Sequence, residues 1–485
     1  MRVGWVVLGI GILLAGGCAL PGGKERGEDA ERFQTKLREE TERFLAEHPA
    51  PMTLSNALAI ARVRTLKLTH AELTARLADL TQSMTFSVFL PKVNVSYGRF
   101  GTADPLETVL MGRPIRLTDQ YVTQVSLTAT QPIFTPQAWL LYAEARHLNR
   151  QAALQLERAR EMLDAQVAAL FYQAAVAEER IRMVEAQVAA STALAEQLKA
   201  QTSRGYALEA DLARIEARVA MDEFELTRAK DARDMTRIRL CEILRLWPDP
   251  RLRLEGDSMT AVLERDWAFR DAEGKPAPLP AAEARTLPLE ELMFQTLLCR
   301  KELWSSDQLC AFSKVLVLQA LAGFLPNVYG GLAGAKNPHA KLFSETVWGG
   351  GIAAVLSVFD GFSTVNAYRM ARLGRKVELR IREERASALL TGTYEAYRNW
   401  RRSTVQKEVA ERLLKACELD YATAKARFDK DQETASQVLD KLSALEQARV
   451  NAVSAAYATA LTEIILRDAV GIGLGTGAPG KQEKK

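Results

Sequence analysis

The sequence predicts a mainly helical protein with two long antiparallel helical hairpins and four short β-strands. Two observations support this prediction. Residues 137–247 and 376–470 contain no proline and only one glycine each, Gly205 and Gly392, and both segments are dense in strong helix formers. Four other segments alternate apolar and polar residues with a period of two, which is typical of strands with one apolar face.

The two helical segments are predicted to form coiled coils. In the first, apolar residues follow one another at spacings of mostly four and three: Leu163, Val167, Leu170, Ala174, Ala177, Ile181, Val184 and Val188. This heptad spacing predicts packing against other helices. A helix from residue 137 to about 202 would be about 100 Å long, which no compact domain can enclose. Each segment is interrupted once, at residues 203–206 and 428–431, so each is expected to fold as two antiparallel helices joined by a tight turn.

The predicted strands have the length of strands that cross a membrane, about 9 to 12 residues. They are residues 91–101, 121–130, 326–335 and 347–358. The polar residues 102–120 and 336–346 are expected to be exposed loops.

The two halves of the chain repeat one another. Residues 89–93 read Phe-Leu-Pro-Lys-Val, and residues 324–328 read Phe-Leu-Pro-Asn-Val. Ahead of the first motif, Thr53 is the expected N-cap of a helix that runs to about residue 88. The predicted segments after the N-terminal region are a first repeat, a linker or equatorial segment, a second repeat and a flexible tail, at residues 52–247, 248–287, 288–473 and 474–485.

Composition and motifs exclude several classes of function. The chain has 64 Lys and Arg against 60 Asp and Glu, a balance too even for a dedicated nucleic-acid binder. Phosphate-binding loops, zinc-protease motifs and nucleophile elbows are missing from the sequence, so we expect no cofactor and no enzyme activity. Four cysteines lack the spacing of a metal site and are expected to be free thiols: Cys241, Cys299, Cys310 and Cys417.

The N-terminus predicts export. Residues 1–17 combine a basic residue, a short apolar run and small residues directly before Cys18, which resembles the signal peptide of a bacterial lipoprotein. Cys18 is then the lipidation site, and residues 18–51 form a lipidated tether. Ala19 follows the cysteine where an aspartate would favour inner-membrane retention, so the resemblance predicts the outer membrane. An ordinary signal peptide with a chance cysteine is the alternative.

Four strands cannot close a barrel by themselves. Open strand edges in lipid are prohibitive, because each backbone group without a hydrogen-bond partner costs about 2–7 kcal/mol. If these strands lie in a membrane, several chains must contribute their strands to one barrel, and three chains give twelve strands. The long helices would pool in the same way into a hollow α-barrel, so the whole object would be a conduit.

With these features in place, the sequence resembles the TolC-type outer-membrane efflux protein family, in its lipoprotein branch. The resemblance rests on the helix start at Thr53, on the repeated Phe-Leu-Pro-x-Val motif, and on residues 131–134 and 359–361 at strand-to-helix transitions. It implies a homotrimer with a twelve-stranded outer-membrane β-barrel and a periplasmic α-barrel. It also implies docking to a periplasmic adaptor protein and an inner-membrane transporter, in an efflux or type I secretion system.

The resemblance also implies site residues at the periplasmic end of the tube. Asp440 matches an acidic position that narrows the family's tube, and Gln437 replaces a second acid, so both are assigned to the periplasmic gate. A solvated helix carboxylate is the alternative for Asp440. The residues expected to contact the adaptor at the hairpin turns are Arg204, Gly205, Phe428 and Asp431.

Two other functions compete with the conduit. The first is a periplasmic coiled-coil scaffold or adaptor lipoprotein, but one chain here has two hairpins and membrane-length strands. The second is an envelope hydrolase with a helical stalk. Its only candidate region, near residues 248–288, is too short and offers no nucleophile and base.

Overall fold

The structure is a computed structural model. It describes residues 23–48, 51–101, 107–116, 121–205, 208–249, 251–254, 263–271, 273–336, 346–428, 430 and 432–474. The predicted signal peptide, the lipidation site Cys18, the turn residue Asp431 and almost all of the predicted tail lie outside the described residues.

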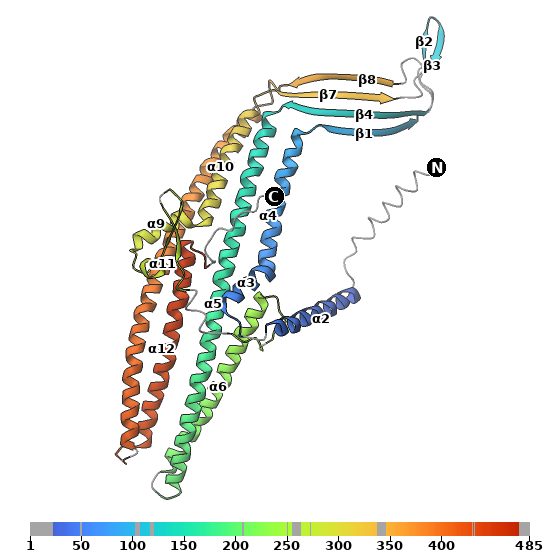
Figure 1. Ribbon diagram of the computed structural model, residues 1–485. Helices are drawn as coiled ribbons and strands as arrows, with labels where there is room; N and C mark the ends of the chain where they lie inside the picture. The colour runs from blue at the N-terminus through green and yellow to red at the C-terminus, as the bar shows by residue number, and fades with distance from the viewer. Residues whose placement is uncertain are drawn as a thin grey trace.

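Two helical hairpins form most of the molecule, as the sequence predicts (Figure 1). α5 (Pro136–Thr202, 67 residues) pairs with α6 (Glu209–Ile243), and α11 (Ser363–Phe428, 66 residues) pairs with α12 (Ala435–Val470). Pro136 starts α5 at a position where a helix needs no N–H donor. Six of the eight residues of the heptad seam are buried, and Leu170 and Val188 are half-buried.

The internal repeat is visible in the lengths of the elements. α3 (Leu54–Arg64) and α9 (Leu289–Cys299) have 11 residues each. α4 (Leu66–Phe86) has 21 residues and α10 (Lys301–Ala322) has 22. The short 3-10 helix η1 (Ser87–Phe89) follows α4. Each half therefore contains, in this order, a short helix, a longer helix, two strands of the sheet and a helical hairpin.

The prediction of one continuous helix from residue 54 to about residue 88 is wrong. The chain breaks at Thr65, whose backbone is extended (φ −68°, ψ 125°), and its hydroxyl donates to the Ile243 carbonyl at 2.8 Å. Arg300 has nearly the same conformation between α9 and α10 (φ −66°, ψ 120°). Cys299 and Cys310 therefore lie on different helices, and both are free thiols, as are Cys241 and Cys417.

The breaks allow the helices to be stacked end to end. In the half nearer the sheet, α5 contacts α4 and α10, and α10 contacts α11. In the half nearer the tips, α5 contacts α6 and α12, and α12 contacts α11. Each chain therefore presents a layer four helices wide at both levels, with α6 continuing α4 and α12 continuing α10 (Figure 1).

The four predicted strands form one antiparallel sheet at one end of the helical layer (Figure 1). Its order is β1-β4-β7-β8, and the strands are β1 (Lys92–Gly101), β4 (Tyr121–Phe134), β7 (Asn327–Lys336) and β8 (Thr346–Val355). The predicted loop at residues 102–120 contains a further hairpin of β2 (Glu107–Leu110) and β3 (Arg113–Arg116). Its turn, Met111 and Gly112, has positive φ at both residues, which is typical of tight hairpins.

The region between the repeats is folded rather than a plain linker. β5 (Trp267–Arg270), β6 (Pro276–Leu279) and α8 (Ala281–Ala284) pack on α9, α11 and α12. Trp267 is fully buried in this cluster. On the other side, α2 (Gly23–Glu47) projects from the middle of the molecule and is anchored at its C-terminal end by buried Phe44 (Figure 1).

Within the described residues, no helix combines the length and the apolar character needed to cross a bilayer.

A buried ion pair fixes the folded middle segment to α12. Arg467 is 2% exposed and donates to Glu463 Oε1 at 3.0 Å, to the carbonyls of Leu263 and Arg265, and lies over the Trp267 ring at 5.1 Å. Glu463 is also paired with Arg285 at 3.0 Å. Removing one member of such a buried network leaves polar groups without partners, which is costly.

We expect Arg467→Met to lower the free energy of unfolding by about 3 kcal/mol, because it leaves Glu463 and two carbonyls short of a donor. The control is Arg380→Met, whose side chain is 81% exposed and pairs with Glu383 on the same helix surface. That variant should change stability by less than about 1 kcal/mol. Thermal and denaturant unfolding followed by circular dichroism checks both values, and equal losses would contradict the assignment.

Candidate functional site: the unpaired edges and the hairpin tips

The sheet has two open edges. β1 pairs only with β4, and β8 pairs only with β7, in the part of the chain that the structure describes. Among the described residues, the outer side of each edge strand therefore has no neighbouring strand. Such edges pair readily with another strand, and in lipid they must do so.

One face of the sheet is apolar. β1 and β4 place apolar residues directly opposite one another in three pairs: Val93 with Ala129, Val95 with Leu127, and Tyr97 with Val125. Trp348 continues this face on β8, and its ring lies where a Cβ on Gly334 would fall, at 2.5 Å. On β1 and β4 the other face is polar, with Ser96 and Ser126 hydrogen-bonded at 2.6 Å, and on β7 and β8 it carries small residues such as Ala333 and Gly349. Strands of about ten residues with this alternation suit a barrel wall between lipid and water.

The helical layer has matching open edges. α4 lies at one edge and exposes a heptad-spaced apolar stripe, every member more than half exposed: Leu73, Leu77, Leu80 and Met84. α11 lies at the other edge and exposes a second stripe, also more than half exposed: Met370, Leu373 and Val377. Unpartnered apolar stripes at heptad spacing are the surfaces on which helices pack.

The two hairpin tips are held together by an apolar cluster. Its buried residues come from both hairpins: Leu194, Leu198, Ile215, Ala424, Phe428 and Val438. Phe428, assigned from the sequence to adaptor contact, is 8% exposed and serves to pack the second tip on the first. The ring is therefore not part of the exposed surface of the chain.

The first turn presents an exposed basic residue. Gly205 has φ +77°, a conformation that favours glycine, and its N–H donates to the Thr202 carbonyl at 3.0 Å. Arg204 precedes it and is exposed. The geometry of this turn depends on Gly205. The turn geometry sets the position of the exposed Arg204 side chain.

Gln437 and Asp440 have different environments. Gln437 is in a capping box with Thr434: its Oε1 accepts from the Thr434 N–H at 2.9 Å, and its own N–H donates to the Thr434 hydroxyl at 3.4 Å. Its side chain is thus committed to starting α12. Asp440 is exposed and lies about 200° around the helix from buried Val438 and Leu442, on the face away from the core of the chain.

A buried polar cluster joins the two hairpins farther from the tips. Arg218 on α6 contacts Asp222 at 3.0 Å and Glu446 on α12 at 3.0 Å, and Gln187 on α5 donates to Asp222 at 2.6 Å. Asp222 is 2% exposed and Glu446 8%. Burial raises the pKa of Glu446 to about 7, and the nearby Asp222 adds to this while Arg218 opposes it.

Sequence reasoning did not find this cluster. Arg218, Asp222 and Glu446 look like ordinary charges on coiled-coil surfaces. The detectable signal is that Asp222 and Glu446 fall at packing positions of their helices. No group of His, Cys, Asp and Glu among the described residues could hold a metal ion.

Comparison of the sequence with protein-family models and with curated proteins finds no match. Comparison of the fold with solved structures finds outer-membrane channels. VceC from Vibrio cholerae is 14% identical, with a TM-score of 0.70 over 87% of this chain and 97% of that one. CusC is 14% identical, with a TM-score of 0.71 over 87% and 93%. The Campylobacter jejuni CmeC channel is 16% identical, with a TM-score of 0.67 over 87% of each chain.

The chain therefore has the fold of outer-membrane channel proteins. This confirms, at the level of the fold, the resemblance to the TolC-type family on which the sequence interpretation rests.

We expect the ionisation of Glu446 to make the protein less stable at high pH. The folded state raises the pKa of this carboxyl from 4.5 to about 7, so it holds a proton that the unfolded chain releases, and stability falls as the pH rises through this window. Glu446→Gln should therefore melt at a higher temperature than the parent protein at pH 8 and at a similar temperature at pH 5.

The control is Glu418→Gln, an exposed carboxylate on α11, which should leave the pH dependence unchanged. Melting curves at pH 5, 6, 7 and 8 measure the effect. A Glu446→Gln variant that is less stable than the parent at pH 8 would show that the ion pair with Arg218 outweighs the cost of burial.

Proposed function

We propose that this protein is the outer-membrane channel component of a tripartite efflux or type I secretion system. It passes substrates from an inner-membrane pump and a periplasmic adaptor to the cell exterior, and it transports without catalysing a reaction. The proposal rests mainly on one observation: membrane-length strands with open edges lie at the end of a helical layer whose two longest helices, α5 and α11, are each about 100 Å long.

The proposed assembly is a homotrimer. Three chains supply twelve strands, and joining β8 of one chain to β1 of the next removes every open edge. The same arrangement gives twelve helices around the tube at each level and brings the stripe on α4 against the stripe on α11. The strand order β1-β4-β7-β8 follows the order α4-α5-α10-α11 of the helices next to these strands in the chain, which supports one interface for both kinds of open edge.

The proposed location is the outer membrane, with a long periplasmic portion and a lipid anchor at Cys18. The apolar face of the sheet supports contact with outer-membrane lipid. α2 supports a tether, because it projects from the middle of the molecule (Figure 1). Labelling of the wild type, but not of Cys18→Ser, with a palmitate analogue tests the anchor separately from the channel.

The adaptor is proposed to dock at the hairpin tips, where Arg204 is exposed and Gly205 shapes the turn. Asp431 remains part of this proposal from the sequence alone. The gate is proposed to be formed by Asp440, one from each chain, because its side chain is exposed on the face away from the core. Gln437 supports the gate by capping the helix that carries Asp440.

A periplasmic scaffold or adaptor lipoprotein is less well supported. Its function would not require a sheet with an apolar face and two open edges. The outer-membrane channels that share the fold cover 87% of the chain, which leaves no large part of it for another architecture.

Electron microscopy of the detergent-extracted protein tests the assembly. We expect a three-fold tube well over 100 Å long with a detergent belt at one end. Leu77→Glu with Leu80→Glu should convert the trimer to monomers, because the charges face an apolar stripe. Ser83→Glu, which adds one such charge on another face of α4, should leave it assembled. A single-rod particle from the wild type would support the scaffold instead.

Single-channel currents test the gate. Asp440→Asn should weaken cation preference and block by multivalent cations, since three carboxylates at one level attract cations strongly. Glu418→Asn, a carboxylate removed elsewhere on the hairpin, should leave both unchanged. Unaltered selectivity in Asp440→Asn would mean that this residue is a solvated helix carboxylate.

A further inference from the structure

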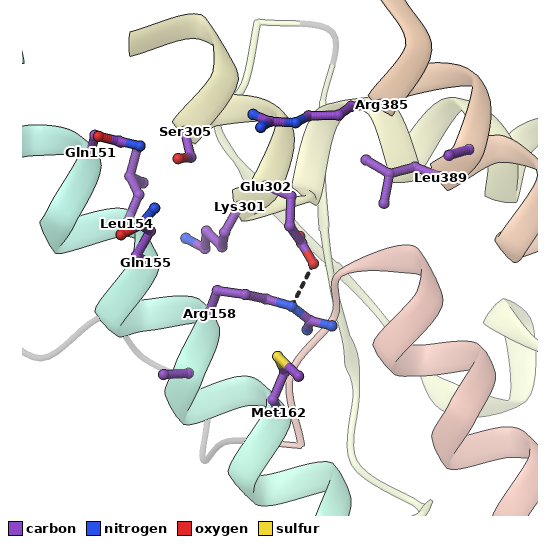
Figure 2. Close-up of a pocket in the computed structure, with 12 residues that line it drawn as sticks. Gln151, Leu154, Gln155, Arg158, Met162, Lys301, Glu302, Ser305, Arg385 and Leu389 are labelled. Atoms are coloured by element: carbon purple, nitrogen blue, oxygen red, sulfur yellow. Dashed lines mark ion pairs between the residues drawn. The ribbon is translucent and has the colours of Figure 1, made fainter. Parts of the chain in front are cut away.

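A cavity of about 450 Å³ lies where α5, α10 and α11 meet (Figure 2). Its volume is within the range of small-molecule sites, about 300–1,000 Å³. It is separate from the open edges and from the hairpin tips. All of its walls come from one chain, so it does not depend on the proposed assembly.

The walls of the cavity are largely apolar. Leu154 and Met162 from α5 and Leu389 from α11 contribute to them from different sides, as Figure 2 shows. A hydrocarbon chain in this space would be removed from water on several sides. Each buried CH₂ group contributes about 0.8 kcal/mol to such binding.

Most charges at the cavity are already neutralised. Arg158 Nε is 2.6 Å from Glu302 Oε1, and its Nη1 is 2.5 Å from Asp468 Oδ1. Lys301 Nζ is 2.7 Å from Glu157 Oε2. These pairs therefore contribute little net charge to the space between the helices.

Arg385 differs from Arg158 and Lys301 because it forms no ion pair with a described carboxylate. Its Nη1 donates to the Ser306 hydroxyl at 2.7 Å, and no described carboxylate lies within ion-pair distance of its guanidinium. Figure 2 shows this side chain extending from α11 over the cavity toward Ser305. An arginine has five N–H donors in a fork that matches a carboxylate, so most of its hydrogen-bonding capacity is available.

Ser305 adds a second polar group at the same place. It lines the cavity and is only 7% exposed. Gln151 and Gln155 line the α5 side near it. The buried Ser305 hydroxyl and the N–H groups of Arg385 that form no ion pair can bind an oxyanion. The neighbouring apolar walls can hold an apolar tail.

We propose that this cavity binds a single-chain anionic amphiphile with a carboxylate head group. The head group accepts hydrogen bonds from Arg385 and Ser305, and the tail lies against Leu154, Met162 and Leu389. Because α5 belongs to the first repeat and α10 and α11 to the second, a bound molecule links the two repeats in the tube wall.

The full-length protein in nanodiscs of zwitterionic lipid provides the test. The probe is octanoate with a diazirine near the end of its chain. We expect light-induced labelling of the peptides that contain Leu154, Met162 and Leu389. Free octanoate should compete with the probe, and octyltrimethylammonium should not.

Arg385→Gln should reduce labelling of these peptides about tenfold, which corresponds to the loss of one charge-assisted contact. Arg380→Gln, on an exposed face of the same helix, should label like the parent protein. Leu389→Trp fills the cavity while keeping Arg385, so it should also prevent labelling, and circular dichroism verifies that each variant is folded. Labelling that survives both Arg385→Gln and Leu389→Trp, or that the cationic amphiphile competes away equally, would overturn the proposal.

Discussion

The structure depends on one constraint. In the described part of one chain, the edge strands have no neighbouring strand on their outer side, and the exposed apolar stripes have no helix packed against them. In the part of the chain that the structure describes, the outer strands β1 and β8 each have one side without a neighbouring strand, where backbone N–H and C=O groups form no ladder. In water these groups could bind solvent, but next to lipid they cannot. The helical layer has a similar feature, because α4 and α11 expose apolar stripes at its two edges. A chain with open edges on both sides can act as the repeating unit of a closed ring, as in the trimer proposed above.

The duplication of the chain provides the geometry that the proposed ring needs. Two copies of the same series of elements give two strand pairs and two hairpins, and the breaks at Thr65 and Arg300 let shorter helices continue the hairpins. The wall thus keeps four helices per chain along its length. Gly471 ends α12 against the second break: its φ is +86°, and an added Cβ would lie 3.0 Å from the backbone of Arg300.

Two clusters of partly buried charges lie where the repeats meet. Arg158, Arg300, Glu302 and Asp468 form a network beside the proposed amphiphile site, and Arg218 with Asp222 and Glu446 forms another between the hairpins. Apolar contacts would tolerate sliding of one long helix on another. Ion pairs tolerate it poorly, because an unpaired buried charge is costly. These clusters therefore set the register of the two hairpins.

The sequence by itself determined the hairpins, the strands and their duplication. Helix formers without breakers, heptad spacing and alternation are local properties of the chain, and glycine at position 205 marked a turn whose φ requires it. The same local patterns also predicted the apolar face of the sheet, because alternation fixes which residues share a side.

Only the tertiary structure decided which of these side chains are used in packing or capping and which are exposed on the surface. Phe428 and Gln437 lie next to a turn, yet one packs the tips together and the other caps a helix. At the break, Thr65 donates a hydrogen bond to Ile243, 178 residues away, a contact that no local pattern encodes. The buried carboxylate of Glu446 and the open guanidinium of Arg385 likewise depend on which helices become neighbours. Such contacts between distant segments are set by the whole fold, so they could not be predicted from periodicity.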